Sequence, residues 1–103
     1  MKLFVFSVFD AAVGAHLQPF FSRSSGEAIR SFQDVVNDQK SGFNQHVTDY
    51  SLFMLGTFDD ASGMFDCRPP DRICTGAELV IKPDDTATPV TWNPYSAVTM
   101  GQR

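Results

Sequence analysis

The first apolar run of the chain, KLFVFSVF at residues 2–9, carries apolar side chains at both odd and even positions. Val and Phe favour the pleated surface of a strand, where successive side chains point to opposite faces. One face holds Leu3, Val5, Ser7 and Phe9, and the other holds Phe4, Phe6 and Val8. Because both faces are apolar, we expect this strand to be central in a sheet or to meet a partner with one face.

A short second strand is predicted for HLQPFFS at residues 16–22, after the turn-capable segment DAAVGA at 10–15. Pro19 has no backbone N–H to donate, so this piece is expected at the edge of the sheet.

A single amphipathic helix is predicted over residues 25–38. Its apolar positions follow the helical repeat and form one stripe, made of Ala28, Ile29, Phe32, Val35 and Val36. Ser24 can cap the helix N-terminus, and Glu27 stands three residues later, as in a capping box. The polar segment NDQKSG ends the helix near Asp38.

The second half of the chain is predicted to add strands joined by turns and loops. The pattern indicates a connector at 43–50, strands at 51–58, 64–67 and 77–82, a hairpin turn at 59–63, and a proline-stiffened loop at 68–72. The expected fold class is therefore α+β: an antiparallel sheet of four or five strands, with the helix on one face and an extended C-terminal tail.

The chain changes character at residue 83. Residues 83–103 contain three prolines and show no period long enough to build a core. We therefore expect a single domain over 1–82 and a tail over 83–103 that packs on the domain or on a second copy. Trp92, Tyr95 and Val98 are the expected anchors.

Charge is unevenly distributed along the chain, whose net charge is −4. All the excess falls in residues 41–67, where Asp49, Asp59, Asp60 and Asp66 face no Lys or Arg. A net negative charge argues against nucleic-acid binding by the overall field of the protein. The uneven distribution is consistent with one acidic face and another that is neutral or locally basic.

Neither a catalytic nor a metal site can be assembled from the sequence. Cys67 and Cys74 have the wrong spacing for a zinc pair, and His16 and His46 are single and far apart. We expect no enzyme activity, no cofactor and no metal. Reduced cysteines, rather than a disulfide closing the loop, suit a cytoplasmic protein. The N-terminal apolar run is too short to span a membrane.

The best candidate site is a surface for single-stranded nucleic acid around the start of the helix. Aromatic rings stack on bases, Arg and hydroxyl groups meet phosphates, and a helix N-terminus favours an anion. The candidate residues are Lys2, Phe20, Phe21, Arg23, Ser24, Ser25, Gly26 and Arg30. The alternative is that both phenylalanines are core, Ser24 only caps the helix, and Arg23 is solvated.

Two further surfaces follow from the pattern. Arg68 and Arg72 stand beside Asp66 and Asp71, which favours local ion pairs over phosphate binding. The doubly apolar first strand suggests self-association, with a homodimer as the first expectation. Its interface would use Phe4, Phe6, Val8, Trp92 and Tyr95.

Several pieces of the first two thirds of the chain resemble a known family. They are the N-terminal MKLF, PFF at 19–21, GEAIRSF at 26–32, VND at 36–38, DYSLF at 49–53 and LGTFDDASG at 55–63. In this combination and order they resemble the small nonstructural protein of gokushoviruses, single-stranded DNA phages of the microvirus group. Val47 follows His46 here, whereas members of the family commonly have a proline after this histidine. The part beyond Phe65 is not covered by the resemblance.

The resemblance implies a phage-encoded, non-capsid protein that acts in the bacterial cytoplasm. Such proteins are described as DNA-binding and as helping the switch to single-stranded genome synthesis during packaging. We therefore expect non-catalytic binding of single-stranded DNA during viral genome replication or packaging. The alternative is an adaptor that binds a viral or host replication or scaffold protein through its acidic face and does not touch DNA.

Overall fold

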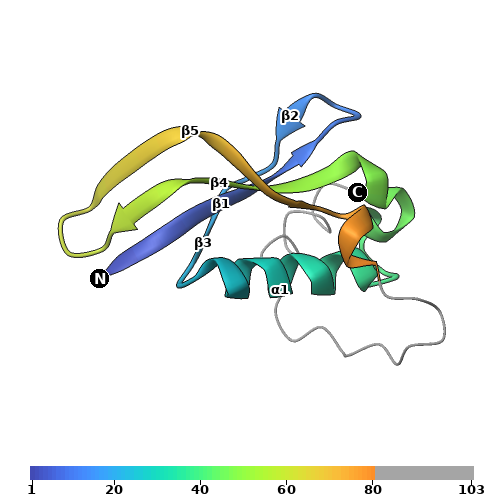
Figure 1. Cartoon of the computed structure of the whole chain (residues 1–103), viewed down its shortest axis with the longest axis horizontal. Helices are drawn as coiled ribbons and strands as arrows, with labels where there is room; N and C mark the ends of the chain where they lie inside the picture. The colour runs from blue at the N-terminus through green and yellow to red at the C-terminus, as the bar shows by residue number, and fades with distance from the viewer. Residues whose placement is uncertain (81–103) are drawn as a thin grey trace.

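The computed structural model describes residues 1–80. These residues form a five-stranded antiparallel sheet with one α-helix on one face, so the predicted α+β class is confirmed (Figure 1). The expected tail over 83–103, with Trp92, Tyr95 and Val98, lies outside the described residues.

The first strand is central, as its two apolar faces predicted. The strands are β1 (Lys2–Asp10), β2 (Ala15–His16), β3 (Phe20–Ser22), β4 (Tyr50–Asp59) and β5 (Met64–Thr75). They lie in the order β2-β1-β4-β5, and β3 also pairs with β1. One edge of β1 thus meets β2 and β3, while its other edge pairs with β4 along its whole length.

The predicted strand at 16–22 is an edge piece, but it is split in two. β2 pairs with the end of β1, β3 pairs with its first half, and residues 17–19 lie between them. Pro19 cannot donate to the ladder, and the backbone N–H of Leu17 donates to the carbonyl of Val8 at 2.7 Å before the chain leaves β1.

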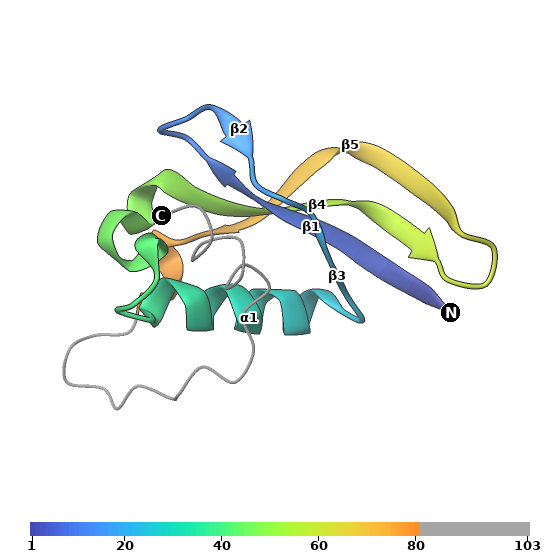
Figure 2. The ribbon, with the colours of Figure 1, turned by 180° about the vertical axis from the view of Figure 1, so that it is seen from behind.

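The helix α1 spans Ser25–Asn37 and covers one face of the sheet (Figure 2). Ser24 caps it as predicted, because its hydroxyl oxygen accepts from the backbone N–H of Glu27 at 3.2 Å. The apolar stripe of α1 packs on β1, β3 and β4 and makes the core. The buried residues of this core are Phe6, Val8, Phe20, Ala28, Phe32, Val35, Val36, Phe43 and Leu52.

The predictions for residues 64–72 were wrong in extent. Instead of a short strand followed by a loop, β5 continues through both prolines to Thr75. The register passes from Gly56↔Cys67 to Met54↔Asp71, so Leu55 alone faces the bulged residues 68–70. Among the described strands β5 pairs only with β4, and an edge strand tolerates prolines at a bulge.

The strand predicted at 77–82 is also wrong over the described residues, which form a short 3-10 helix, η2, at Ala77–Leu79. The Glu78 carboxylate accepts from the backbone N–H of Thr75 at 2.7 Å and from its hydroxyl at 2.9 Å. These local hydrogen bonds favour a turn over strand extension.

The connector before β4 also forms a 3-10 segment. This segment, η1, spans Gly42–Asp49 and is kinked at His46.

The pairing register sorts side chains onto two faces of the sheet, because neighbours across a ladder share a face. The helix face holds Phe4, Phe6 and Val8 of β1, together with their partners Met54 and Leu52. The open face is the side opposite α1. It holds Leu3, Val5, Ser7 and Phe9 together with their partners Phe58, Gly56, Phe53 and Ser51.

Candidate nucleic-acid interface

An open cleft of about 610 Å³, here called the edge cleft, lies where the start of β1, strand β3 and the first half of α1 meet. Its lining includes Leu3, Phe21, Arg23, Glu27, Arg30 and Asp60. Three of the predicted nucleic-acid residues, Phe21, Arg23 and Arg30, therefore border one depression although they come from three different segments.

Short-range hydrogen bonds fix the geometry of the link between β3 and α1. The Ser22 hydroxyl donates to the carbonyl of Ser24 at 3.0 Å, while the Ser24 hydroxyl oxygen caps the first turn of the helix. Arg23 is held between these two serines and is exposed at the cleft. Ser25 and Gly26 form the first helical residues, so the positive end of the helix dipole lies beside Arg23.

The two adjacent phenylalanines have different positions. Phe20 is only 7% exposed, and its ring stacks on Phe6 in the core with the centroids 6.0 Å apart. Phe21 points to the open face and is 44% exposed. The expectation that Phe20 could stack on a base is therefore corrected, since successive strand residues point to opposite faces. Phe21 keeps a ring surface that a base can reach.

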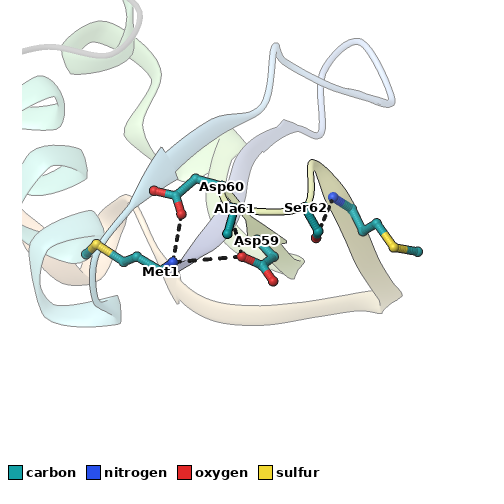
Figure 3. Close-up of polar contacts among 6 residues, drawn as sticks. Met1, Asp59, Asp60, Ala61 and Ser62 are labelled. Carbon is teal, nitrogen blue, oxygen red and sulfur yellow. Dashed lines mark hydrogen bonds and ion pairs between the residues drawn. The ribbon is translucent and has the colours of Figure 1, made fainter.

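Carboxylates balance part of the positive charge in the edge cleft. The N-terminal amine of Met1 donates to Asp60 at 2.7 Å and lies 3.8 Å from Asp59 (Figure 3). Its pKa is raised, chiefly by the hydrogen bond with Asp60. The hydrogen bond from the backbone N–H of Ala61 is the main cause that lowers the pKa of Asp59. Arg23 and Arg30 remain, with Glu27 between them in sequence, as the cationic side chains of the cleft.

Lys2 lies at the first position of β1, opposite Asp59 in the ladder, and is exposed beside the cleft rather than lining it. The predicted group of phosphate-binding side chains is thus assembled only in part. Arg23 and Arg30 share the cleft, and Lys2 lies between the lining residues Met1 and Leu3 in sequence without lining it.

The predicted self-association surface is largely used within the chain. Phe6 and Val8 are 0% exposed because they pack beneath α1, and Phe4 is half-buried against the same core. The one helix therefore covers the face that was expected to need a second copy. Trp92 and Tyr95 lie outside the described residues.

The two arginines of β5 do not form the expected ion pairs. Within residues 1–80, the ion pairs that the structure contains join the Met1 amine to Asp59 and Asp60. Arg72 pairs in the ladder with Phe53 on the open face, whereas Asp71 pairs with Met54 on the helix face. Alternation along the strand thus points the two side chains away from each other.

The cysteines and aspartates that could suggest a catalytic or metal site lie in the β4–β5 part of the sheet. Cys67 and Cys74 are free thiols on opposite faces of β5. Asp59 begins the predicted hairpin turn, where its carboxylate accepts from Ala61 N–H at 3.0 Å. Among the described residues no group of three or more His, Cys, Asp or Glu is placed to hold a metal ion. None of the helices within residues 1–80 has the length and apolar character needed to cross a membrane.

The sequence prediction missed the remaining aromatic residues around Phe21. Phe58 and Phe65 lie with their ring centroids 5.3 and 6.2 Å from that of Phe21. The alternation in β1 had indicated an apolar odd-numbered face, but only the pairing of β1 with β3, β4 and β5 shows which rings gather on it.

The fold and the cleft together define a small α+β protein that presents exposed aromatic and arginine side chains at one edge of its sheet. The chain belongs to the Phage ORF5 protein family, whose model matches residues 3–79. No curated protein and no solved structure matches the chain significantly. This match confirms that the chain belongs to a phage protein family.

Proposed function

We propose that this phage protein is a non-catalytic nonstructural protein of the microvirus type that binds single-stranded DNA in the bacterial cytoplasm during viral genome replication or packaging. The observation that carries the proposal is the exposed ring of Phe21 beside Arg23 and Arg30 at the N-terminus of α1. Stacking on a ring together with cationic contacts to the backbone is the usual way that proteins hold single strands.

The edge cleft suits an unpaired strand better than a duplex. An exposed ring such as Phe21 can stack only on a base that is free of its complement. The two arginines and the first turn of α1 offer hydrogen-bond donors to the phosphates on either side of that base.

The net charge of −4 limits the non-specific affinity, so binding is expected to depend on these local contacts. For single strands, the logarithm of the binding constant falls with the logarithm of salt concentration with a slope of about −0.7 per neutralised phosphate. Contacts from Arg23 and Arg30 would therefore give a slope of about −1.4.

The test is fluorescence anisotropy of a labelled single-stranded oligonucleotide, with the matched duplex as competitor, at several salt concentrations. We expect preference for the single strand and a salt slope that falls by about 0.7 in Arg30→Ala. Lys40→Ala is the matched control, because it removes the same charge from an exposed residue after the end of α1. Failure of the wild-type protein to bind at low salt would overturn the proposal.

A second candidate is an adaptor that binds a basic replication or scaffold protein. Its supporting observation is that Asp59, Asp60 and Asp66 gather at the β4–β5 hairpin, although Asp49 adjoins the other end of β4. This candidate would be favoured if the protein binds a basic protein encoded by the same phage and does not bind DNA. Asp66→Asn should then weaken the protein–protein binding.

A further inference from the structure

The open face of the sheet carries two groups of aromatic rings that the edge cleft does not explain. Figure 2 shows α1 on one side of the sheet, and no other described helix lies on the open face. Side chains from β1, β2, β3, β4 and β5 all reach this face. Its central positions, Val5 and Ser7, are buried, with exposed fractions of 4% and 0%.

The first group, here called the hairpin cluster, consists of Phe21, Phe58 and Phe65. The centroids of Phe58 and Phe65 are 4.7 Å apart, and Phe21 completes the triangle. Phe65 is 55% exposed, so the cluster offers ring surface to solvent. Two exposed rings, Phe21 and Phe65, thus pack on the half-buried Phe58, and contiguous exposed apolar patches of this kind mark interaction sites.

The second group, here called the His16 cluster, consists of Phe9, His16 and Phe53. The imidazole centroid lies 5.0 Å from Phe9 and 5.2 Å from Phe53, and the two phenyl centroids are 6.0 Å apart. A hydrogen bond of 2.7 Å between the Ser7 hydroxyl and His16 Nδ1 holds the imidazole in place. The three rings thus form a fixed, preorganised surface.

The sheet separates its charges between the two faces. The four strand carboxylates lie on the helix face, where Asp10, Asp59, Asp66 and Asp71 pair across the ladder with Tyr50, Lys2, Thr57 and Met54. No Asp or Glu of the described strands occupies an open-face position, where the charged strand residue is Arg72, the ladder partner of Phe53. An acidic protein therefore presents one face that is aromatic and locally cationic.

We propose that the open face is the base-stacking platform for the single strand, with the hairpin and His16 clusters each stacking bases and Arg72 holding a phosphate beside the His16 cluster. This inference rests on the proposed function and extends it from the edge cleft across the sheet. Phe21 connects the two surfaces, because it borders the cleft and belongs to the hairpin cluster. Sheets with exposed aromatic residues bind unpaired bases in the same physical way.

The spacing of the two clusters suits an extended strand. The ladder partners of Phe53 and Phe58, which are Ser7 and Leu3, are four residues apart on β1, which corresponds to roughly 13 Å at about 3.3 Å per strand residue. A strand that contacts both clusters would occupy several nucleotides, within the range of about 4–16 that comparable sheet folds cover.

A second copy of this chain fits the open face less well than a polyanion does. Face-to-face packing of two copies would remove two Arg72 side chains from water, and the strands of this face supply no carboxylate to pair with them. Glu78 lies near enough for Arg72 to contribute to lowering its pKa, but two hydrogen bonds from Thr75 hold its carboxylate. A phosphate supplies the missing anion directly.

The inference is tested by anisotropy with single-stranded DNA on two matched pairs of variants in β5. Phe65→Ala should weaken binding by about 5- to 150-fold, the usual effect of losing one stacking ring, and Phe65→Trp should retain it. Met64→Ala is the control, because Met64 is exposed but pairs with Asp59 on the helix face.

The second pair tests the phosphate contact. Arg72→Ala should weaken binding and reduce the salt slope by about 0.7, whereas Arg68→Ala, which removes the same charge from the bulge of β5, should change the slope little. Circular dichroism and the unfolding midpoint of each variant show whether it is folded.

The outcomes separate this inference from the proposed function. If Phe65→Ala and Arg72→Ala bind single-stranded DNA as tightly as the wild-type protein does, the platform is overturned and the edge cleft remains as the binding site. Absence of any wild-type binding overturns both. A wild-type dimer that becomes monomeric in Phe65→Ala, measured by sedimentation velocity, makes the open face a self-association surface and also overturns the platform.

A measurement on the wild-type protein does not depend on variants that fold. Ultraviolet crosslinking to a single strand containing 5-bromodeoxyuridine, followed by mass spectrometry, should label peptides that contain Phe53, Phe58 or Phe65. Labelling confined to the α1 peptide with Arg30 and Ser31 would contradict the platform.

Discussion

At Gly56 the sheet has no room for a side chain. It is buried between Val5 and Cys67 in the ladder with φ of +156°. A Cβ at this position would overlap the carbonyl oxygen of Asp66 and approach the Cα of Cys67 to 2.8 Å. The close approach of β5 to β4 at the start of the bulge therefore depends on glycine.

Gly56→Ala is expected to lower the free energy of unfolding by about 2–4 kcal/mol, because backbone atoms cannot move aside as a flexible side chain would. The control is Gly42→Ala, where an added Cβ meets nothing within 4 Å. Urea unfolding followed by circular dichroism measures both. Equal stability of the two variants would show that β5 can shift away from β4 at no cost.

The two thiols are expected to differ strongly in reactivity. Burial raises the pKa of Cys74 to about 11, with a further contribution from Glu78. At pH 8 only about one in a thousand Cys74 side chains is then the reactive thiolate. Cys67 is exposed on the edge strand.

Labelling with iodoacetamide at pH 8 should therefore modify Cys67 at least tenfold faster than Cys74, as measured by mass spectrometry of timed samples. The rate at Cys74 should rise with pH towards 11, until unfolding intervenes. The variant Cys67→Ser isolates the slow site, and fast labelling of this variant in the folded state would contradict the assigned burial.

At the scale of the element, Ser24 has two separable roles. It caps α1, and it also lies in the predicted nucleic-acid site next to Arg23. Ser24→Ala should lower the free energy of unfolding by about 1 kcal/mol, because the N–H of Glu27 loses its partner.

The replacement Ser24→Asp distinguishes the two roles. An aspartate also caps helices well and favours the positive end of the dipole, so stability should be retained. Its negative charge should nevertheless weaken binding of single-stranded DNA at the edge cleft. Thermal unfolding and anisotropy on the same samples make the comparison, and unchanged affinity would show that phosphates do not approach the start of α1.

The predictions for β5 failed for a reason that belongs to the element. Pro69 and Pro70 are normally evidence against a strand, so the local sequence RPPDR predicts a loop. The register places these residues in a bulge of an edge strand, where the missing N–H groups break no pairing. Whether two prolines fall in a bulge depends on how the strand pairs with its neighbour, which the local pattern of RPPDR does not contain.

At the scale of the whole molecule, the order of the strands predicts how protection from hydrogen exchange is distributed. β1 has neighbours on both edges, whereas β5 has a described neighbour on one edge only. Amide exchange measured by mass spectrometry should be slowest for Val5–Val8 and faster for Phe65–Arg68. Equal protection of the two strands would indicate that the free edge of β5 is covered.

The candidate site could be predicted only in part from local sequence. Ser24 as the cap and the arginines near the start of α1 follow from short-range rules on capping and charge. The choice between Phe20 and Phe21 did not, because either face of an isolated strand could meet the helix. The pairing of β3 with β1 turns Phe20 inward and Phe21 outward.

Several features of this protein depend on residues that are close together in the chain, and local patterns predict them. These are the α+β class, the central first strand, the helix near 25–38 with its cap, and the turn at 59–63. Periodicity and turn chemistry act over a few residues, so these features can be derived without knowing the fold.

Pairing between distant segments determines which of the two apolar faces α1 covers and which aromatic rings gather on the other. Side chains from five strands meet on the open face, and they do so because of ladder registers between segments up to about 60 residues apart. Burial of Phe6 and Val8 beneath α1, and exposure of Phe21 and Phe65, follow from that long-range pairing. A register is set by competition among whole faces, so no local pattern specifies it.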